Sequence, residues 1–139
     1  MPFGIDREYV RGMNAAVQGK VYPPTRFEVA PDRVASFRAV FGLSDGVPPT
    51  YATVAEFAGY PPLIDDPELG LDFSRVLHGS QEYEYARPLR EGEILTATLR
   101  IESIKVKGTN GFLSVVMDLV GDDGLTACTA RSTLIERSA

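Results

Sequence analysis

The sequence predicts an α+β fold in which an antiparallel sheet wraps around one central helix. Three observations lead to this class. Apolar residues alternate along the segments that follow residue 81, a short helical segment at 51–58 carries alanines on its apolar stripe, and the helices precede most of the strands. Alternation with period two is typical of strands with one buried face. A single sheet must bury that face against another layer, and the 51–58 helix is the cover that the chain offers.

A single domain over residues 1–139 is expected, because a chain of 139 residues with 44% hydrophobic residues is long enough for only one core. The net charge of -5 argues against a nucleic-acid partner, since phosphate binding needs clustered Lys and Arg. The lone cysteine, Cys128, forms no internal disulfide, and too few ligands accompany it for zinc. We therefore expect no metal and no cofactor.

The N-terminus has neither the basic start nor the apolar core of a signal peptide. No apolar run approaches the roughly 18 residues that a membrane-spanning helix needs. We therefore expect a cytoplasmic protein without a membrane partner.

Three elements are expected in the first forty residues. A short helix at 8–17 is possible although Gly12 interrupts it, and a strand is expected at 26–29. A helix then begins at Pro31, whose fixed φ suits a first turn, and ends at Gly42.

The central helix is predicted from Thr50, its expected N-cap, to Gly59. Its apolar stripe consists of Tyr51, Val54, Ala55 and Ala58 at helical spacing. Two alanines on this stripe would let a sheet approach closely. The segment 60–72 is expected to be a long loop without regular structure, and loops of that length are uncommon unless functional.

The remainder is predicted to be an antiparallel meander. A first strand begins near 81, and a second covers 95–106 with a bulge near 102–103 where the alternation changes phase. Asn110-Gly111 indicates a hairpin turn, and 122–124 a second one. The last strand, 125–135, places Cys128, Ala130 and Ser132 on one face, where they are small enough to lie against a helix. This arrangement is the hot-dog fold, which usually completes its core by dimerising.

Several short motifs occur in an order typical of one enzyme family. They are Pro49-Thr50-Tyr51, then 67–73 (PELGLDF), then 76–81 (VLHGSQ) leading to Arg87-Pro88-Leu89. With these motifs the chain resembles the N-terminal hot-dog half of (R)-specific enoyl-CoA hydratase 2, in the MaoC-like hydratase/dehydratase family. The resemblance covers about residues 48–134 and implies an acyl thioester ligand, carried on CoA or on acyl carrier protein.

The catalytic signature of that family is absent. In the catalytic half, Ser-Gly-Asp is followed by one residue, Asn-Pro, one residue and a His, and the Asp and His activate water. Here the corresponding segment, 41–50, reads FGLSDGVPPT: Ser44 is present, Asp45 lies one place early, and the Asn-Pro step and His are missing. The resemblance therefore implies the half that holds the acyl tail, acting in a lyase of fatty acid metabolism. It would work as a homodimer or as a heterodimer with a catalytic hot-dog chain.

Each candidate site residue has a functional and a structural interpretation. His78 is the only imidazole of the chain and a candidate for proton transfer or substrate contact, and Asp45 is a candidate acid-base group or part of a plain turn. Thr50 and Tyr51 lie where first-turn amides could receive a thioester oxygen, but the Tyr51 ring is equally suited to the core. Gly79 allows close approach of a ligand or only eases a bend.

Other side chains favour structural roles. Tyr83 and Tyr85 share one strand face and suit core or interface, whereas Glu82 and Glu84 suit a solvated face. Cys128 is expected to be a small buried residue.

Two alternative functions remain open. A hot-dog thioesterase needs a carboxylate near the central helix, and Glu56 is the only one within it, although it falls off the predicted stripe. A non-enzymatic module that binds acyl thioesters is the other, and fold alone does not separate these functions.

Overall fold

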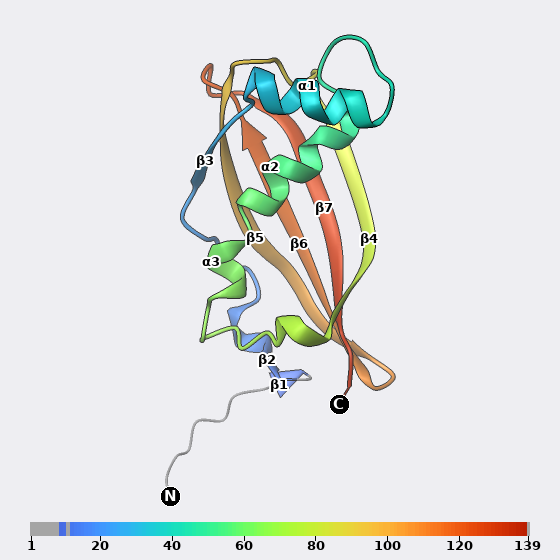
Figure 1. Ribbon diagram of the computed structural model, residues 1–139. Helices are drawn as coiled ribbons and strands as arrows, with labels where there is room; N and C mark the ends of the chain where they lie inside the picture. Colours follow the sequence, from blue (N-terminus) through green and yellow to red (C-terminus); the bar gives the residue numbers. More distant parts are fainter. Residues whose placement is uncertain (1–8, 11, 139) are drawn as a thin grey trace, which may run out of the picture.

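The architecture is a five-stranded antiparallel sheet curled around a short helix, as the computed structural model shows (Figure 1). The structure describes residues 9–10 and 12–138. The strand order is β3-β5-β6-β7-β4, and every pairing is antiparallel. The helix α2 lies in the hollow of the sheet, α1 crosses one end of it and α3 lies toward the other end (Figure 1). The predicted hot-dog fold of the α+β class is confirmed.

The elements follow one another with short connections. They are β1 (Tyr9–Val10), β2 (Met13–Asn14), η1 (Ala15–Val17), β3 (Thr25–Glu28), α1 (Pro31–Val40), η2 (Pro49–Tyr51), α2 (Ala52–Ala58), α3 (Pro61–Ile64), η3 (Phe73–Arg75), β4 (Val76–Tyr85), β5 (Ile94–Lys107), β6 (Asn110–Val120) and β7 (Thr126–Glu136).

The buried face of α2 differs from the predicted stripe. From residue 52 to residue 59, the buried positions are Ala52, Ala55, Glu56 and Gly59, whereas Val54 and Ala58 are only partly buried. Gly59 permits the close approach, because a Cβ there would lie 2.6 Å from Met117 Cε. The stripe was predicted from apolar residues alone, so it missed a buried carboxylate that finds polar partners on the sheet.

The start of α2 also differs from the prediction. A 3-10 turn, η2, precedes the helix, its N-cap is Pro48, and no side chain caps it. Thr50 is therefore an exposed residue inside that turn rather than the N-cap. Pro48 explains the missing cap, because its side chain has no oxygen to accept a hydrogen bond, and the Tyr51 amide donates to the Pro48 carbonyl instead.

The predicted helix at 8–17 is wrong where the structure describes it. Residues 9–10 and 13–14 pair as strands β1 and β2, and only Ala15–Val17 forms a single 3-10 turn. Gly12 adopts a φ of 99°, which turns the chain between the two strands and is unfavourable for other residues. Residues 8 and 11 of that prediction lie outside the described residues.

The predicted loop at 60–72 contains one turn of helix, α3, held by hydrogen bonds such as that from the Leu63 amide to the Tyr60 carbonyl (2.9 Å). Leu63 and Leu69 are fully buried. Apolar anchors therefore order a segment that its prolines and aspartates suggested to be irregular.

The predicted meander is confirmed for β5, β6 and β7, but it is wrong for its first strand, because β4 pairs with β7 at the other side of the sheet and not with β5. The bulge predicted near 102–103 is present between Ile101 and Ser103. The hairpin turn consists of Gly108 and Thr109, because Lys107 pairs with Asn110, so the predicted turn at Asn110-Gly111 was placed too late. Gly108 takes the left-handed conformation (φ 62°) that the tight turn requires. The strand β4 itself begins at Val76 rather than Gln81.

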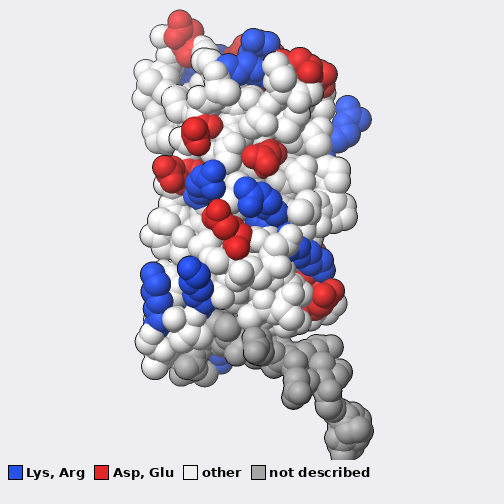
Figure 2. Space-filling view, turned by 180° about the vertical axis from the view of Figure 1, so that it is seen from behind, with Lys and Arg blue, Asp and Glu red and all other residues white. Residues whose placement is uncertain are grey.

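The far side of the sheet is a mixed polar surface. Figure 2 shows basic and acidic side chains interspersed across its middle, without a large area of one sign. Arg131 and Glu102 form one ion pair there, at 3.6 Å. Among the described residues, no helix is both long enough and apolar enough to cross a membrane.

Candidate functional site

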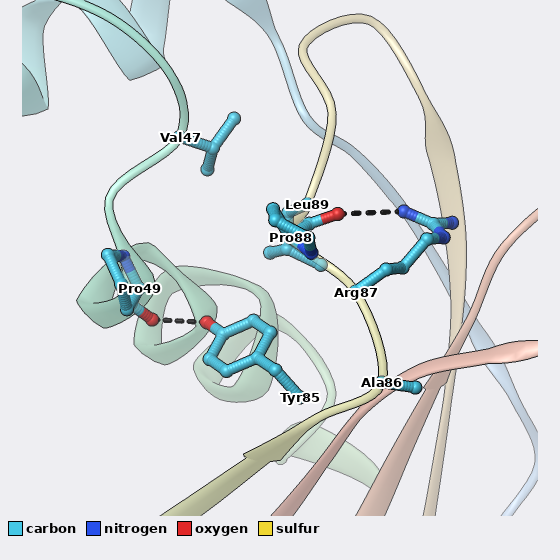
Figure 3. Close-up of a pocket in the computed structure, with 7 residues that line it drawn as sticks. All are labelled: Val47, Pro49, Tyr85, Ala86, Arg87, Pro88 and Leu89. Carbon is cyan, nitrogen blue, oxygen red and sulfur yellow. Dashed lines mark hydrogen bonds between the residues drawn. The ribbon is translucent and has the colours of Figure 1, made fainter.

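A pocket of about 340 Å³ lies between the segment that leads into α2 and the end of β4 (Figure 3). One wall comes from Val47 and Pro49, and the other from the turn after β4. The turn residues that line it are Ala86, Arg87, Pro88 and Leu89, with Tyr85 at the last position of the strand. Most of these side chains are apolar. The pocket therefore suits a hydrocarbon group.

Two polar interactions hold the walls in place. The Tyr85 hydroxyl donates to the Pro49 carbonyl and so ties β4 to the start of the central helix (Figure 3). Arg87 binds both carboxylate oxygens of Glu93, at 3.0 and 2.7 Å. Gly121 makes room for this guanidinium, because a Cβ there would lie 2.5 Å from Arg87 Nη2. The turn is thus fixed by a two-pronged ion pair, which is a strong and directional contact.

The pocket contains no group suited to proton transfer. Burial is the main cause that raises the pKa of the Tyr85 phenol, so the group stays neutral. Burial alone would raise the pKa of Glu93, but the bonds from Arg87 and from the Arg90 amide outweigh it and lower that pKa. The charge of Arg87, which lines the pocket, is therefore neutralised by Glu93 beside it. The arrangement can bind an apolar chain but offers no acid or base to it.

His78 and Asp45 lie far apart. Asp45 is exposed in the loop before α2, next to Gly46, whose carbonyl accepts a bond from Arg38. Arg38 also binds Glu91, which places that loop near the turn after β4. His78 is exposed seven residues before the end of β4, about 20 Å from that turn at the rise of a strand. The two side chains do not form an acid-base pair within this chain.

Tyr51 is a core residue. Its side chain is 1% exposed, and its ring meets the Phe37 ring edge-on at 5.2 Å and lies 6.4 Å from that of Phe27. Its amide already donates to the Pro48 carbonyl (2.9 Å), so this first-turn group is not free for a thioester oxygen. The neighbouring Thr50 is exposed. The structure therefore does not bring these two residues together with His78.

Gly79 lies at a break in the pairing of β4 with β7, between His78 and Ser80. A Cβ at this position would lie 2.7 Å from Ile135 Cδ1 and 3.3 Å from the Thr133 carbonyl oxygen. The space beside Gly79 is thus filled by the neighbouring strand. The glycine serves close packing at a bulge, which is the structural one of its two interpretations.

Three comparisons with known proteins agree with this fold. Residues 3–120 match the family described as FAS1-like, dehydratase domain region. This chain belongs to that dehydratase family. A UPF0336 protein of Saccharopolyspora erythraea is 33% identical over 137 residues, which cover 86% of this chain and 88% of the relative.

Two solved structures show the same fold as this member of the dehydratase family. The first is a chain of the C-terminally truncated HadBC (3R-hydroxyacyl-ACP dehydratase) complex of Mycobacterium tuberculosis, with a TM-score of 0.73, 17% identity, and coverage of 86% of this chain and 96% of that one. The second is a MaoC-like dehydratase, with a TM-score of 0.75 and 19% identity. The match covers 89% of this chain but only 43% of that longer one. The predicted resemblance to MaoC-like proteins is thereby confirmed for the fold.

One polar cluster of this dehydratase-family chain was missed by the sequence analysis. Glu56 is 1% exposed, and its carboxylate contacts Gln81, Ser132 and Tyr83. A signal was available, since Gln81 and Ser132 both occupy positions that the strand alternation places on the inner face. Buried polar groups need hydrogen-bond partners. Two polar residues on the inner face of the sheet therefore predict a further polar group opposite them.

The remaining candidates behave as expected. Tyr83 and Tyr85 are half-buried toward α2, while Glu82 and Glu84 are exposed. Cys128 is fully buried, and burial is the main cause that raises the pKa of its thiol to about 11. A thiol of this kind is a poor nucleophile.

Proposed function

We propose that this chain is the non-catalytic, acyl-tail-binding subunit of an (R)-specific 3-hydroxyacyl thioester dehydratase or enoyl hydratase. One observation carries the proposal. The loop at 41–50, where the family places its catalytic Asp and His, contains no histidine, and the only histidine of the chain lies at the other end of β4. The chain thus has the fold of the family without the acid-base pair.

The apolar pocket supports the tail-binding role. It opens beside that same loop, through Val47 and Pro49, so a thioester that reacts near this region would extend its tail toward the pocket. Burying a methylene group contributes about 0.8 kcal/mol. A pocket of about 340 Å³ is therefore large enough to contribute to the selection of chain length.

The free edge of the sheet supports a partner chain. Among the described residues, the ten-residue strand β4 pairs only with β7, so no described strand bonds to the backbone groups on its other side. This segment contains neither Pro nor Lys, the residues that commonly protect an edge. We propose that a second hot-dog chain, which carries the intact Asp and His, continues the sheet there. A chain of the solved HadBC complex is similar in fold to this chain, which supports the expectation of a partner chain.

The thioesterase alternative finds no support in the geometry. Glu56, the carboxylate that it requires, is 1% exposed and is surrounded by Gln81, Ser132 and Tyr83. No face of this carboxylate is open to a substrate and a water molecule. The non-enzymatic binder differs from our proposal only in having no catalytic partner.

The deciding experiment is hydration of short and long trans-2-enoyl-CoA by this chain alone, by a catalytic Asp/His hot-dog chain alone, and by the co-expressed pair. We expect activity toward long substrates only with the pair. Enzymatic rates from this chain alone would contradict the non-catalytic assignment. Binding of a long acyl-CoA with no gain of activity in the pair would favour the non-enzymatic binder.

Val47→Phe tests the pocket itself. The larger ring would displace several methylene groups of the tail, and loss of two such contacts corresponds to about tenfold in kcat/KM for long substrates. Crotonyl-CoA, which has almost no tail, should be hydrated at an unchanged rate. Val40→Phe is the matched control, because Val40 is 79% exposed on α1 and does not line the pocket. Equal effects of the two substitutions would remove the pocket from the proposal.

A further inference from the structure

The buried cluster around Glu56 has a hydrogen count that can be worked out atom by atom. Gln81 Nε2 has two hydrogens, and it donates one to Glu56 Oε2 (3.0 Å) and one to the Arg131 main-chain oxygen (3.3 Å). Turning this amide over would set its oxygen against that carbonyl and against the Glu56 carboxyl. The orientation of the Gln81 amide is therefore fixed by its surroundings.

The Ser132 hydroxyl has one hydrogen and two close acceptors. Its Oγ lies 2.6 Å from Gln81 Oε1 and 3.0 Å from Glu56 Oε2. The shorter contact needs the hydroxyl hydrogen, since two bare oxygen acceptors at that distance repel each other. The contact between Ser132 and Glu56 then contains a hydrogen only if the Glu56 carboxyl supplies it.

The other side of the carboxyl group accepts a bond in the ordinary way. Glu56 Oε1 accepts from the Tyr83 hydroxyl at 3.4 Å, and that hydroxyl lies 2.6 Å from Thr53 Oγ1. With a proton on Oε2, every contact of the cluster has one donor and one acceptor. With an ionised carboxylate, one buried contact has no hydrogen at all.

The surroundings of Glu56 favour the same state. Among the described residues no Lys or Arg pairs with it. The titratable groups that face it are Tyr60 beyond α2, Cys128 on β7, and Tyr83 and His78 on β4, and only His78, which is exposed, can carry a positive charge. Burial is the main cause that raises the pKa of Glu56. An ionised carboxylate without a buried cation is strongly unfavourable.

We infer that Glu56 is a neutral carboxylic acid at neutral pH, protonated on Oε2, and that this proton completes the network that joins α2 to β4 and β7. The inference stands whether or not the proposed function is correct. Because loss of this proton at alkaline pH would remove one hydrogen bond, the contact between α2 and the edge strand β4 should weaken as pH rises.

Infrared spectroscopy of the isolated chain at neutral pH tests the inference directly, because a protonated carboxylic acid has its own C=O stretching band. We expect this band in the native protein and a clear loss of its intensity in Glu56→Gln. Glu136→Gln is the matched control, since Glu136 is also fully buried and its pKa is also raised by burial. Absence of the band from the native protein, or its complete loss in Glu136→Gln, would overturn the inference.

Unfolding measured as a function of pH is a second test of the protonation state of Glu56. The folded pKa of Glu56 lies above its unfolded value of about 4.3, so its stabilising contribution is full below that pH and is lost as pH rises through the folded pKa. The unfolding constant of the native protein relative to Glu56→Gln should therefore rise up to tenfold per pH unit in this window. His78→Gln, measured in parallel, is the control for a substitution beside the cluster that keeps Glu56. Equal slopes in the native protein and Glu56→Gln would contradict the inference, and if Glu56→Gln does not fold, the infrared bands of the native protein and Glu136→Gln still decide.

Discussion

Gly79→Ala probes the closest packing between the edge strand and its neighbour. The added methyl would lie 2.7 Å from Ile135 Cδ1, 3.1 Å from Ile135 Cγ1 and 3.3 Å from the Thr133 carbonyl oxygen. The first of these distances is too short for two carbon atoms. Either the Ile135 side chain turns away or β4 separates from β7 at the bulge.

The expected loss of stability is about 1–2 kcal/mol. Overpacking of this kind typically costs about 1–3 kcal/mol. Alanine restricts the unfolded chain more than glycine does, and this stabilises the folded protein by about 0.4–1 kcal/mol. The gain applies here because the backbone at residue 79 is not left-handed. For a chain of this length, the net loss corresponds to a fall in Tm of roughly 3–7 °C.

Thermal and urea unfolding of the isolated chain measure this effect, and Ile135→Val supplies the control. Valine lacks only the Cδ1 atom that makes the shortest contact, so the double variant should recover most of the loss. The coupling energy between the two substitutions should be at least about 0.5 kcal/mol. A Gly79→Ala protein as stable as the native one, or no coupling with Ile135→Val, would refute the packing argument and return Gly79 to the ligand-binding candidates.

Three further predictions concern the pocket turn, the helix contact and the thiol. Arg87→Ala should lower stability by about 2 kcal/mol at neutral pH, because it leaves the largely buried Glu93 carboxylate unpaired. Since the folded pKa of Glu93 is lowered, this difference should shrink as pH falls through that pKa, and a pH-independent difference in urea unfolding would contradict the ion-pair explanation. Gly59→Ala should lower stability by about 1–3 kcal/mol through its contact with Met117, and an unchanged Tm would show that the helix has room to move. Cys128 should resist iodoacetamide at pH 8 until urea unfolds the chain, and rapid labelling of the native protein would show that the thiol is reachable.

The sequence could predict the parts of the candidate site that depend on local pattern. The bulge near residue 102 followed from a change of phase in the alternation, and the position of α1 followed from Pro31 and the spacing behind it. The absence of the catalytic signature at 41–50 was also visible, because it depends only on the order of residues. The pocket was not visible, since its walls come from residues 47–49 and 85–89 and meet only when β4 packs beside α2.

The sequence by itself determined the alternating period of the long strands and the order along the chain of β3, α1, α2 and β4 to β7, and with them the hot-dog fold, because hydrophobic alternation acts between near neighbours. Only the tertiary structure decided the surroundings of individual side chains. It separated His78 from Asp45, buried Tyr51 against α1, and placed Glu56 against partners 25 and 76 residues away. The physical reason is that a buried carboxyl group is stable only where distant strands supply its hydrogen bonds, and no local pattern specifies which strands those are.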